Sequence, residues 1–218
     1  MILLAIDTAG GDCSAAVYDS ETGVLLGAVT ETIGTGHAEK LMAMIDGALE
    51  AAGLPLEAVE RIAVTVGPGS FTGIRVGVSA ARGLALALGI AAVGISTLQV
   101  LAATAPRDSA GRPVLAAMDA KRGEIYAQLF SADGKPLTDA EALTVEAVNQ
   151  LLSETKAVVV GSAMALLADG DVVRQPDRFP IGVVARLGAD AEPAGRPKPL
   201  YLRGPDAKVQ TGFAIARM

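Results

Sequence analysis

The sequence predicts an α/β protein built from two related lobes. The apolar residues of the first half recur with the periods of strand, strand, strand, helix, strand, helix and strand. Both halves open alike, because Asp7-Thr8-Ala9-Gly10-Gly11-Asp12 and Asp119-Ala120-Lys121-Arg122-Gly123-Glu124 each begin a hairpin. Hydrophobic residues make up 51% of the 218 residues and charged residues 19%, which excludes disorder as the main state. A duplicated two-lobed architecture fits these openings better than one continuous doubly wound sheet.

Apolar periodicity places the elements of the first half. Short apolar runs separated by turns predict a three-strand meander, and a change to helical spacing predicts the first helix, which Gly53 ends. A buried strand, a Gly-rich loop, a long helix and another strand follow. In order, we expect strands over 2–6, 13–18 and 24–32, a helix over 38–52, a strand over 62–66, a loop over 67–73, a helix to about Leu88 and a strand over 91–95.

The second half begins after a helical stretch through Leu101 and a polar link over 106–113. We therefore divide the chain into an N-terminal lobe, residues 1–104, and a smaller C-terminal lobe, residues 105–218. The tail over 192–206 holds four prolines and is expected to be irregular. The other expected elements are strands over 114–118, 124–130 and 157–160 and helices near 145–152 and 183–187.

Composition excludes several classes of function. With 18 Lys and Arg against 24 Asp and Glu, the net charge of −6 argues against a chain that grips a phosphate backbone by itself. A single cysteine, Cys13, excludes an intrachain disulfide and a Cys-rich zinc site. A single histidine, His37, excludes every scheme that needs two imidazoles. These features favour a reducing, cytoplasmic location.

The mean hydropathy of +0.43 raises the question of a membrane. The longest strongly apolar stretch, residues 83–95, has 13 residues, fewer than the ~20 that cross a bilayer. The first seven residues contain no basic region and already include Asp7, unlike a signal peptide. We therefore expect a soluble protein without a membrane anchor.

The most distinctive segment is the Gly-rich loop in Val66-Gly67-Pro68-Gly69-Ser70-Phe71-Thr72-Gly73-Ile74-Arg75-Val76-Gly77. Between a strand and a helix, such a loop presents backbone N–H groups that can hold an anion. It lacks the spacing and the lysine of a Walker A loop, and it resembles the dinucleotide fingerprint only loosely. The alternative is that its glycines only shape a tight turn.

The helix behind this loop is apolar on most sides. Between Ile74 and Leu88 its only charges are Arg75 and Arg82, which lie on one face. A stripe of small residues at steps of four allows another helix to approach closely, either within the chain or from a partner. The stripe consists of Gly73, Gly77, Ala81, Ala85 and Gly89.

A few single residues have two interpretations each. His37, just before the first helix, is more often a capping or packing residue than a catalyst. Asp7 and Asp119 end strands, where carboxylates hold phosphates or metals but also shape turns. Cys13 is expected to pack as a small hydrophobic side chain.

The Asp7-Thr8 opening, His37-Ala38-Glu39-Lys40-Leu41, the Gly-rich loop, Asp119 to Tyr126 and Pro199-Leu200-Tyr201-Leu202-Arg203 together resemble the TsaB (YeaZ) family over nearly the whole chain. The resemblance implies the two-lobed actin-like/Hsp70-like ATPase (ASKHA) fold with duplicated β-β-β-α-β-α-type halves. It also implies a non-catalytic subunit that activates TsaD, the threonylcarbamoyl transferase that forms threonylcarbamoyladenosine in tRNA.

The resemblance separates this chain from the TsaD paralogue. TsaD carries an H-x-x-x-H metal pair where this sequence places Thr97 and Leu101, so no metal and no metalloprotease activity are expected. No second Gly-rich loop completes an adenosine pocket in the C-terminal half, so we expect no cofactor and no catalytic residue. The alternatives are a stand-alone ASKHA-type ATPase or kinase, a Rossmann-type oxidoreductase and an obligate homodimer with no other partner.

The resemblance also implies the partners. In the family, TsaB pairs with TsaD through the first two helices, the small ATPase TsaE joins them, and homodimers form through the same helices. Binding of tRNA by this chain alone is not expected. We expect the small-residue stripe to face the partner, so that Gly77→Leu or Ala81→Leu abolishes pairing and leaves the fold intact. The expected interface residues are Leu41, Ile45, Gly73, Arg75, Gly77, Ala81, Arg82 and Ala85.

Overall fold

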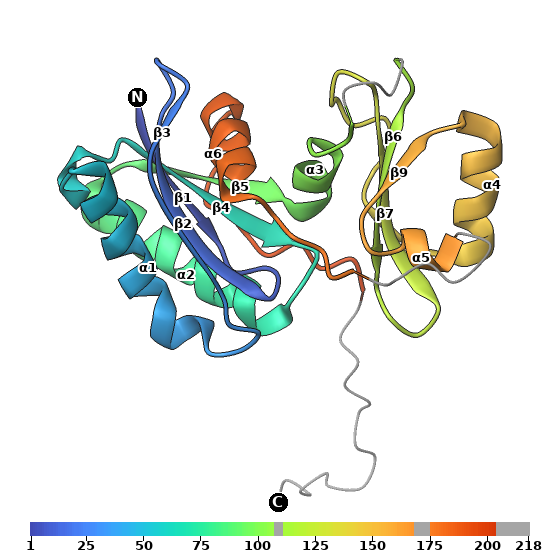
Figure 1. Cartoon of the computed structure of the whole chain (residues 1–218), viewed down its shortest axis with the longest axis horizontal. Coiled ribbons are helices and arrows are strands. Elements are labelled where there is room, and N and C mark those ends of the chain that lie inside the picture. Colours follow the sequence, from blue (N-terminus) through green and yellow to red (C-terminus); the bar gives the residue numbers. More distant parts are fainter. Residues whose placement is uncertain (107–110, 168–174, 204–218) are drawn as a thin grey trace, which may run out of the picture.

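The computed structural model describes residues 1–106, 111–167 and 175–203. Two lobes lie side by side, each containing one sheet (Figure 1). The predicted two-lobed α/β fold is confirmed.

The first sheet has the order β3-β2-β1-β4-β5. The first three strands form the predicted antiparallel meander, and β4 and β5 run parallel to β1. Each predicted strand of this half is present within one or two residues of its expected bounds. The strands are β1 (Ile2–Asp7), β2 (Asp12–Asp19), β3 (Val24–Thr32), β4 (Arg61–Gly67) and β5 (Ala91–Ser96).

Helices cover both faces of this sheet. Helices α1 (His37–Ala52) and α2 (Phe71–Leu88) lie on one face and α6 (Ile181–Asp190) on the other (Figure 1). Successive residues of β4 show this directly, because Val64 lies under Gly77 of α2 and Ala63 lies under Gly188 of α6. A short 3-10 helix, η1 (Leu56–Ala58), connects α1 to β4.

The second sheet, β8-β7-β6-β9, repeats most of the first. Strands β6, β7 and β8 are antiparallel neighbours and β9 pairs parallel with β6, which matches β1, β2, β3 and β4 in the first sheet. The predicted duplication is therefore visible in the topology. The elements are β6 (Val114–Asp119), β7 (Glu124–Phe130), β8 (Glu141–Thr144), β9 (Val158–Val160), α3 (Thr97–Ala102), α4 (Val145–Thr155) and α5 (Met164–Leu167).

Some elements differ from the sequence predictions. We did not expect η1, β8 or α5, each of which has no more than four residues and therefore too few to show a period. Helix α6, expected within the second lobe, packs on the first sheet through Val184, Ala185 and Gly188. The division at residues 104 and 105 stays a prediction, to which the structure adds that the second part of the chain supplies a helix to the first sheet.

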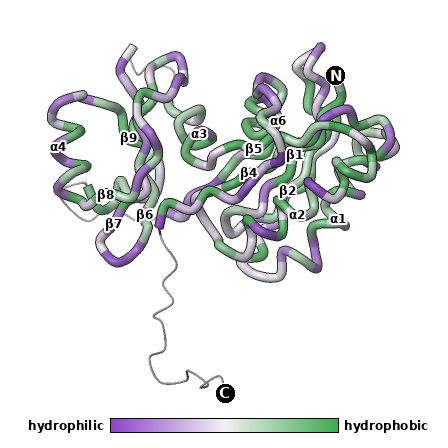
Figure 2. Tube along the Cα trace, turned by 180° about the vertical axis from the view of Figure 1, so that it is seen from behind, coloured by the Kyte–Doolittle hydropathy of each residue, from purple (hydrophilic) through white to green (hydrophobic). Residues whose placement is uncertain are grey.

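Capping residues explain where α1 ends and where α2 begins and ends. Gly53 and Gly89 adopt the left-handed conformation that closes α1 and α2, with φ of 65° and 67°. The Ser70 hydroxyl accepts a hydrogen bond from Gly73 N at 3.2 Å and caps the start of α2. Hydrophobic residues collect in the strands of both sheets, and hydrophilic residues in the turns (Figure 2).

Helix α2 reaches the length and apolar composition of a membrane-spanning helix, with 18 residues. Counting only strictly apolar residues, as the sequence prediction did, hid this property because Arg75 and Arg82 interrupt the run. One such helix is weak evidence for a membrane, since core helices share these features, and a third of α2 is buried against the sheet.

The contact between α6 and the first sheet can be tested at a glycine. A Cβ at Gly188 would lie 2.2 Å from the Ala63 Cβ, so Gly188→Ala should lower the free energy of unfolding by about 1–3 kcal/mol. Gly182→Ala, in the same helix, is the matched control because its Cβ would lie 3.9 Å from Leu25. Urea denaturation measures both. Equal stability of the two variants would contradict the close packing of α6.

Candidate partner-binding surface

The four members of the small-residue stripe that lie within α2 are buried on the side that faces the chain's own sheet, whereas Gly89, after the helix, is exposed. A Cβ at Gly73 would lie 2.0 Å from the Thr8 carbonyl oxygen, and one at Gly77 2.4 Å from Thr8 Oγ1. The Thr8 hydroxyl donates a hydrogen bond of 2.7 Å to the Gly73 carbonyl oxygen. Only glycine leaves room for this approach of α2 to the end of β1. The internal interpretation of the stripe is correct, and the expectation that it faces a partner is wrong.

The other small and apolar residues of the expected interface are also internal. Ala81 and Ala85 lie on the inward side of α2, and Leu41 and Ile45 on the inward side of α1, all within the core. Among the eight expected residues, only Arg75 and Arg82 are exposed. A stripe of small residues indicates that another element packs closely against the helix. It does not indicate whether that element is a strand of the same chain or a helix of a partner.

The outward side of α2 is formed by other residues. The exposed residues without charge include Thr72, Ser79, Gly83, Leu86 and Ala87, and the exposed Arg75 and Arg82 lie beside them. Leu86 is 76% exposed, the largest exposed fraction among the large hydrophobic side chains, and Met42 on the outward side of α1 is 49% exposed. Gly83 has no atom within 4 Å of its ideal Cβ position. A mid-helix glycine that the chain itself does not need is consistent with a neighbour outside the chain.

Arg75 holds the segment around Tyr201 against α2. Its Nε donates to the Tyr201 hydroxyl at 2.8 Å, and its guanidinium carbon lies 3.7 Å from the centre of the Phe71 ring. Leu200 N donates to the Val66 carbonyl oxygen at 2.8 Å. We call residues 191–203 the strap, because they return along α2 and β5 to the second lobe. There Arg203 forms an ion pair with Glu124.

The Gly-rich loop turns back on the first hairpin. Ser70 N donates to the Ala9 carbonyl oxygen at 2.8 Å, so this N–H group is not directed at an anion. Gly69, with φ of 157°, brings its ideal Cβ position within 2.4 Å of the same oxygen. These glycines therefore shape a close turn, the alternative that the sequence left open.

Asp7 lies beneath this turn and is 1% exposed. Its Oδ1 accepts hydrogen bonds from Thr65 Oγ1 at 2.6 Å and Ala9 N at 3.1 Å. Its Oδ2 has no hydrogen-bond partner within the described part of the chain. Burial raises the pKa of this carboxyl to about 6. Asp7 is therefore a structural group rather than an exposed metal-side acid.

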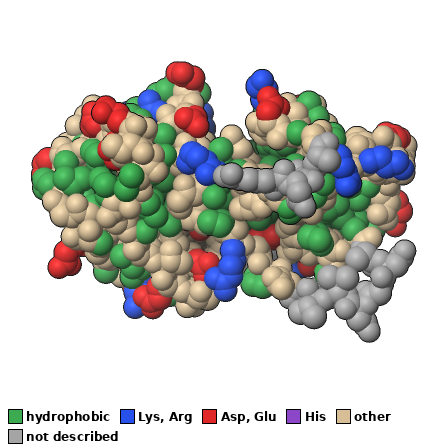
Figure 3. Space-filling view, turned by 45° about the horizontal axis from the view of Figure 1, so that its top comes forward, with side chains coloured by type: hydrophobic (Ala, Val, Ile, Leu, Met, Phe, Trp, Pro, Cys, Tyr) green, Lys and Arg blue, Asp and Glu red, His purple; other side chains and the backbone are tan. Residues whose placement is uncertain are grey.

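A pocket of about 440 Å³ separates the lobes beside Gly10, Ser70 and Asp119. On its far side, Lys121 Nζ lies 2.9 Å from Asp119 Oδ2, and Asp177 accepts from Ser162 N at 2.7 Å. Burial also raises the pKa of Asp177. The sequence did not reveal the Ser162–Asp177 pair, because no periodic pattern connects these residues. Figure 3 brings the opposite end of the lobes forward and shows a separate hollow between them at its top.

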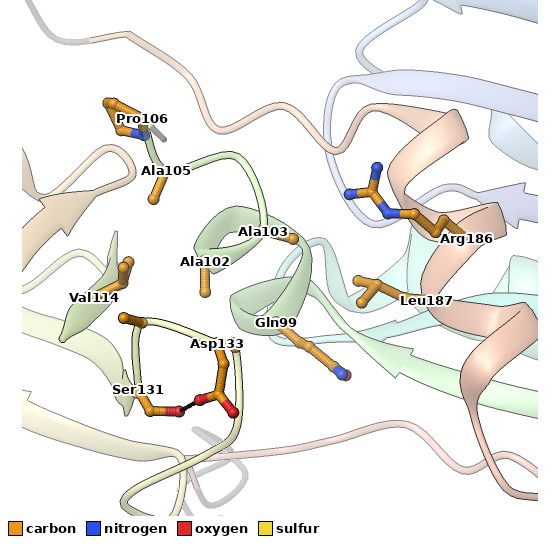
Figure 4. Close-up of a pocket in the computed structure, with 12 residues that line it drawn as sticks. Gln99, Ala102, Ala103, Ala105, Pro106, Val114, Ser131, Asp133, Arg186 and Leu187 are labelled. Carbon is orange, nitrogen blue, oxygen red and sulfur yellow. Dashed lines mark hydrogen bonds between the residues drawn. The ribbon is translucent and has the colours of Figure 1, made fainter. Parts of the chain in front are cut away.

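A second pocket of about 440 Å³ lies between α3, the turn after β7 and α6 (Figure 4). Alanines form much of its wall. Asp133, on one side, accepts a hydrogen bond from the Ser131 hydroxyl and pairs with Lys135, and Arg186 lies across the pocket on α6. Ser131 also accepts from Lys135 N, so these polar side chains close the turn after β7.

His37 and Cys13, which also had two interpretations, are both buried in the first lobe. His37 Nε2 lies 3.1 Å from the Asp12 carbonyl oxygen at the start of α1, where the side chain is buried. Cys13 is buried in β2, and burial raises the pKa of its thiol to about 11. Both agree with the packing interpretation.

Comparison with known proteins identifies the family. A family model described as TsaD, tRNA N6-adenosine threonylcarbamoyltransferase, matches residues 17–176. The tRNA threonylcarbamoyladenosine biosynthesis protein TsaB of Escherichia coli K12 is 30% identical over 222 residues, covering 93% of this chain and 95% of that one. The chain belongs to the TsaB family.

Other TsaB-family proteins support this membership. YeaZ from Pseudomonas aeruginosa, a solved structure, superposes with a TM-score of 0.76 at 28% identity, covering 92% of this chain and 99% of that one. TsaB of Buchnera aphidicola from Schizaphis graminum is 38% identical over 125 residues, covering 57% and 58% of the two chains.

The actin-like fold of the TsaB family implies a nucleotide with Mg²⁺ between the lobes, but the residues of this chain do not fit that group. The carboxyl of Asp7 is enclosed, and its Oδ1 is already held by Thr65 and Ala9. The Ser70 N–H is bound to Ala9. Within residues 1–106, 111–167 and 175–203, no three His, Cys, Asp or Glu side chains are grouped to hold a metal ion.

Thr97 and Leu101, at the positions where TsaD carries its metal pair, are also packed inside the protein. Thr97 is fully buried, and its hydroxyl donates to the Pro68 carbonyl oxygen at 2.5 Å. Leu101 is 5% exposed and belongs to the core. In this TsaB-family chain the two side chains support the Gly-rich loop and the α3 contact rather than a metal.

Burial of Asp7 predicts a pH-dependent stability. Its pKa rises from an ordinary 3.8 to about 6 in the folded chain. The folded state therefore binds the proton more tightly, and the resulting stability is complete below about pH 4 and is lost as the pH rises through about 6. The loss amounts to about 3 kcal/mol. Asp7→Asn removes this titration and should flatten the dependence.

Urea denaturation between about pH 4 and 7 measures the effect as the difference between the wild type and Asp7→Asn. Asp139→Asn, at an exposed carboxyl of the second lobe, controls for the loss of one acid. If the free energy of unfolding changes with pH in the same way for the wild type and Asp7→Asn, the pKa of the Asp7 carboxyl is not raised.

Proposed function

We propose that this chain is the non-catalytic partner subunit that binds and activates a TsaD-type transferase in the formation of threonylcarbamoyladenosine in tRNA. The observation that carries the proposal is the outward side of α2, where Leu86 and Gly83 are exposed beside Arg82 on a chain of the TsaB family. The residues that the structure describes leave this surface uncovered.

The proposed docking surface, which replaces the expected stripe, consists of Met42 on α1 and Ser79, Gly83 and Leu86 on α2. Exposed apolar side chains beside a glycine suit a second pair of helices, because small residues let helix axes approach closely. Arg82, also exposed, borders this surface. The partner's own first two helices are the proposed neighbours.

The proposed non-catalytic role is supported by the interlobe side chains. The carboxylates of Asp7, Asp119 and Asp177 already interact with groups of the chain itself. The one histidine is buried at the start of α1. Activation is then proposed to occur by association, with the transfer chemistry on the TsaD-type subunit.

Two further associations belong to this proposal. A TsaE-type ATPase is proposed to join the assembled pair, and a homodimer through α1 and α2 is proposed for the chain alone. Both subunits are proposed to act in the cytoplasm. A stand-alone ATPase would instead require this chain to hydrolyse ATP without any partner.

Gly83→Leu should prevent pairing and preserve the fold. The new side chain would project into open space and should weaken binding to the TsaD of the same organism by at least about tenfold, as a bulky group does at a close helix contact. Gly77→Leu should instead lower the free energy of unfolding by about 3 kcal/mol or more, because its Cβ meets Thr8.

Size-exclusion chromatography with light scattering on each variant, alone and mixed with TsaD, measures pairing. Ala147→Leu, on exposed α4, controls for an added surface leucine. Full pairing by Gly83→Leu would exclude this surface as the interface. No complex with the wild type, together with ATP hydrolysis by the chain alone, would replace the proposal with the ATPase.

A further inference from the structure

A groove of about 520 Å³ opens along the side of α2 that faces the strap. Its floor is apolar, with Ala85, Leu86 and Ile90 near the end of α2 and Pro193 and Pro197 from the strap. Arg82 on α2 and Arg196 on the strap line the same groove, and both are exposed. No acidic residue lines it.

The strap is fixed on both sides of the groove. Before it, Arg61 Nη1 donates to the carbonyl oxygens of Ala189 and Ala191 at 2.9 and 3.0 Å. After it, Arg75 and Tyr201 form the contact described above. Between these points Pro197 is buried, and its Cβ lies 3.4 Å from the ideal Cβ position of Gly94 on β5. Arg196, next to Pro197, is therefore held in place before any ligand arrives.

The two arginines have no partner in the described part of the chain. Neither Arg82 nor Arg196 makes an ion pair or hydrogen bond with any residue that the structure describes. The sequence around Arg82 is also free of acids, because residues 61–107 contain four arginines and neither Asp nor Glu, in a chain with a net charge of −6. Positive charge is therefore concentrated around Arg82 in an acidic protein.

We infer that this groove binds an acidic segment of a partner protein, with carboxylates at Arg82 and Arg196 and an apolar side chain between them. Carboxylates suit both guanidinium groups, and the apolar floor and exposed Leu86 suit an aliphatic or aromatic side chain. The volume of the groove accommodates a few side chains, so the ligand is a short segment and not a whole domain.

A nucleic acid fits this groove less well. Its lining offers two cations and no aromatic side chain on which a base could stack, because Phe71 and Tyr201 lie near the opposite end of α2. A net charge of −6 opposes a polyanion that makes many contacts, whereas a short acidic peptide needs only the two arginines.

This inference does not depend on the TsaD-type partner. The groove shares Gly83 and Leu86 with the proposed docking surface, but its charges lie on the side of α2 that faces the strap. Substitution of Arg196 changes only the groove, and substitution of Met42 changes only the docking surface.

Selection of a random dodecapeptide library displayed on phage, with the full-length chain as bait, tests the inference. The selected peptides should contain two acidic residues flanking an apolar one. The tightest of them, labelled with fluorescein, should lose about tenfold in affinity with Arg82→Gln and with Arg196→Gln, measured by fluorescence anisotropy. Lys198→Gln, two residues along the strap and outside the groove lining, is the matched control and should bind as the wild type.

A labelled oligoadenylate of 12 nucleotides is measured in parallel, and thermal melting confirms that each variant folds. Selected peptides without acids, or acidic peptides whose affinity is the same for Arg82→Gln and Arg196→Gln, overturn the inference. The inference is also overturned, in favour of a nucleic-acid surface, if the wild type binds oligoadenylate and both arginine variants lose that binding but keep the binding of peptide.

Discussion

The close approach of α2 to the end of β1 is the constraint on which the first lobe depends. Gly73 and Gly77 allow Thr8 to lie against the helix and to donate its hydroxyl hydrogen to the Gly73 carbonyl oxygen. This contact sets the direction in which the helix leaves the sheet, so it also determines which residues face outward. The exposed outer side, the arginine that holds the strap and the groove beside it all follow from the same placement.

Polar groups between the lobes are used within the chain itself. Ser70 N bonds to Ala9, Asp7 accepts from Thr65, and Asp177 accepts from Ser162. These hydrogen bonds hold together the loops that face the cleft. They therefore make the position of each loop depend on the others.

The sequence allowed the meander and the order of elements in the first lobe to be anticipated, because strong local signals define them. Gly53 ends α1 in the left-handed conformation, and the two hairpins repeat at Asp7 and Asp119. The sequence could not show which neighbour the small-residue stripe packs against, because a strand of the same chain and a helix of a partner require the same small residues. The partnership of Ser162 with Asp177 and the return of α6 to the first sheet arise only in three dimensions, so no local period marks them.

The return of α6 has a consequence for how the protein is made. Leu3 and Ala63 of the first sheet are covered by a helix that begins at Ile181, near the end of the chain. During vectorial synthesis on a ribosome, the N-terminal lobe emerges early but keeps one apolar face open until nearly all of the second lobe has been translated. The nascent chain therefore presents a continuous site for chaperones over most of its translation, and a fragment that stops before α6 would carry that open face permanently.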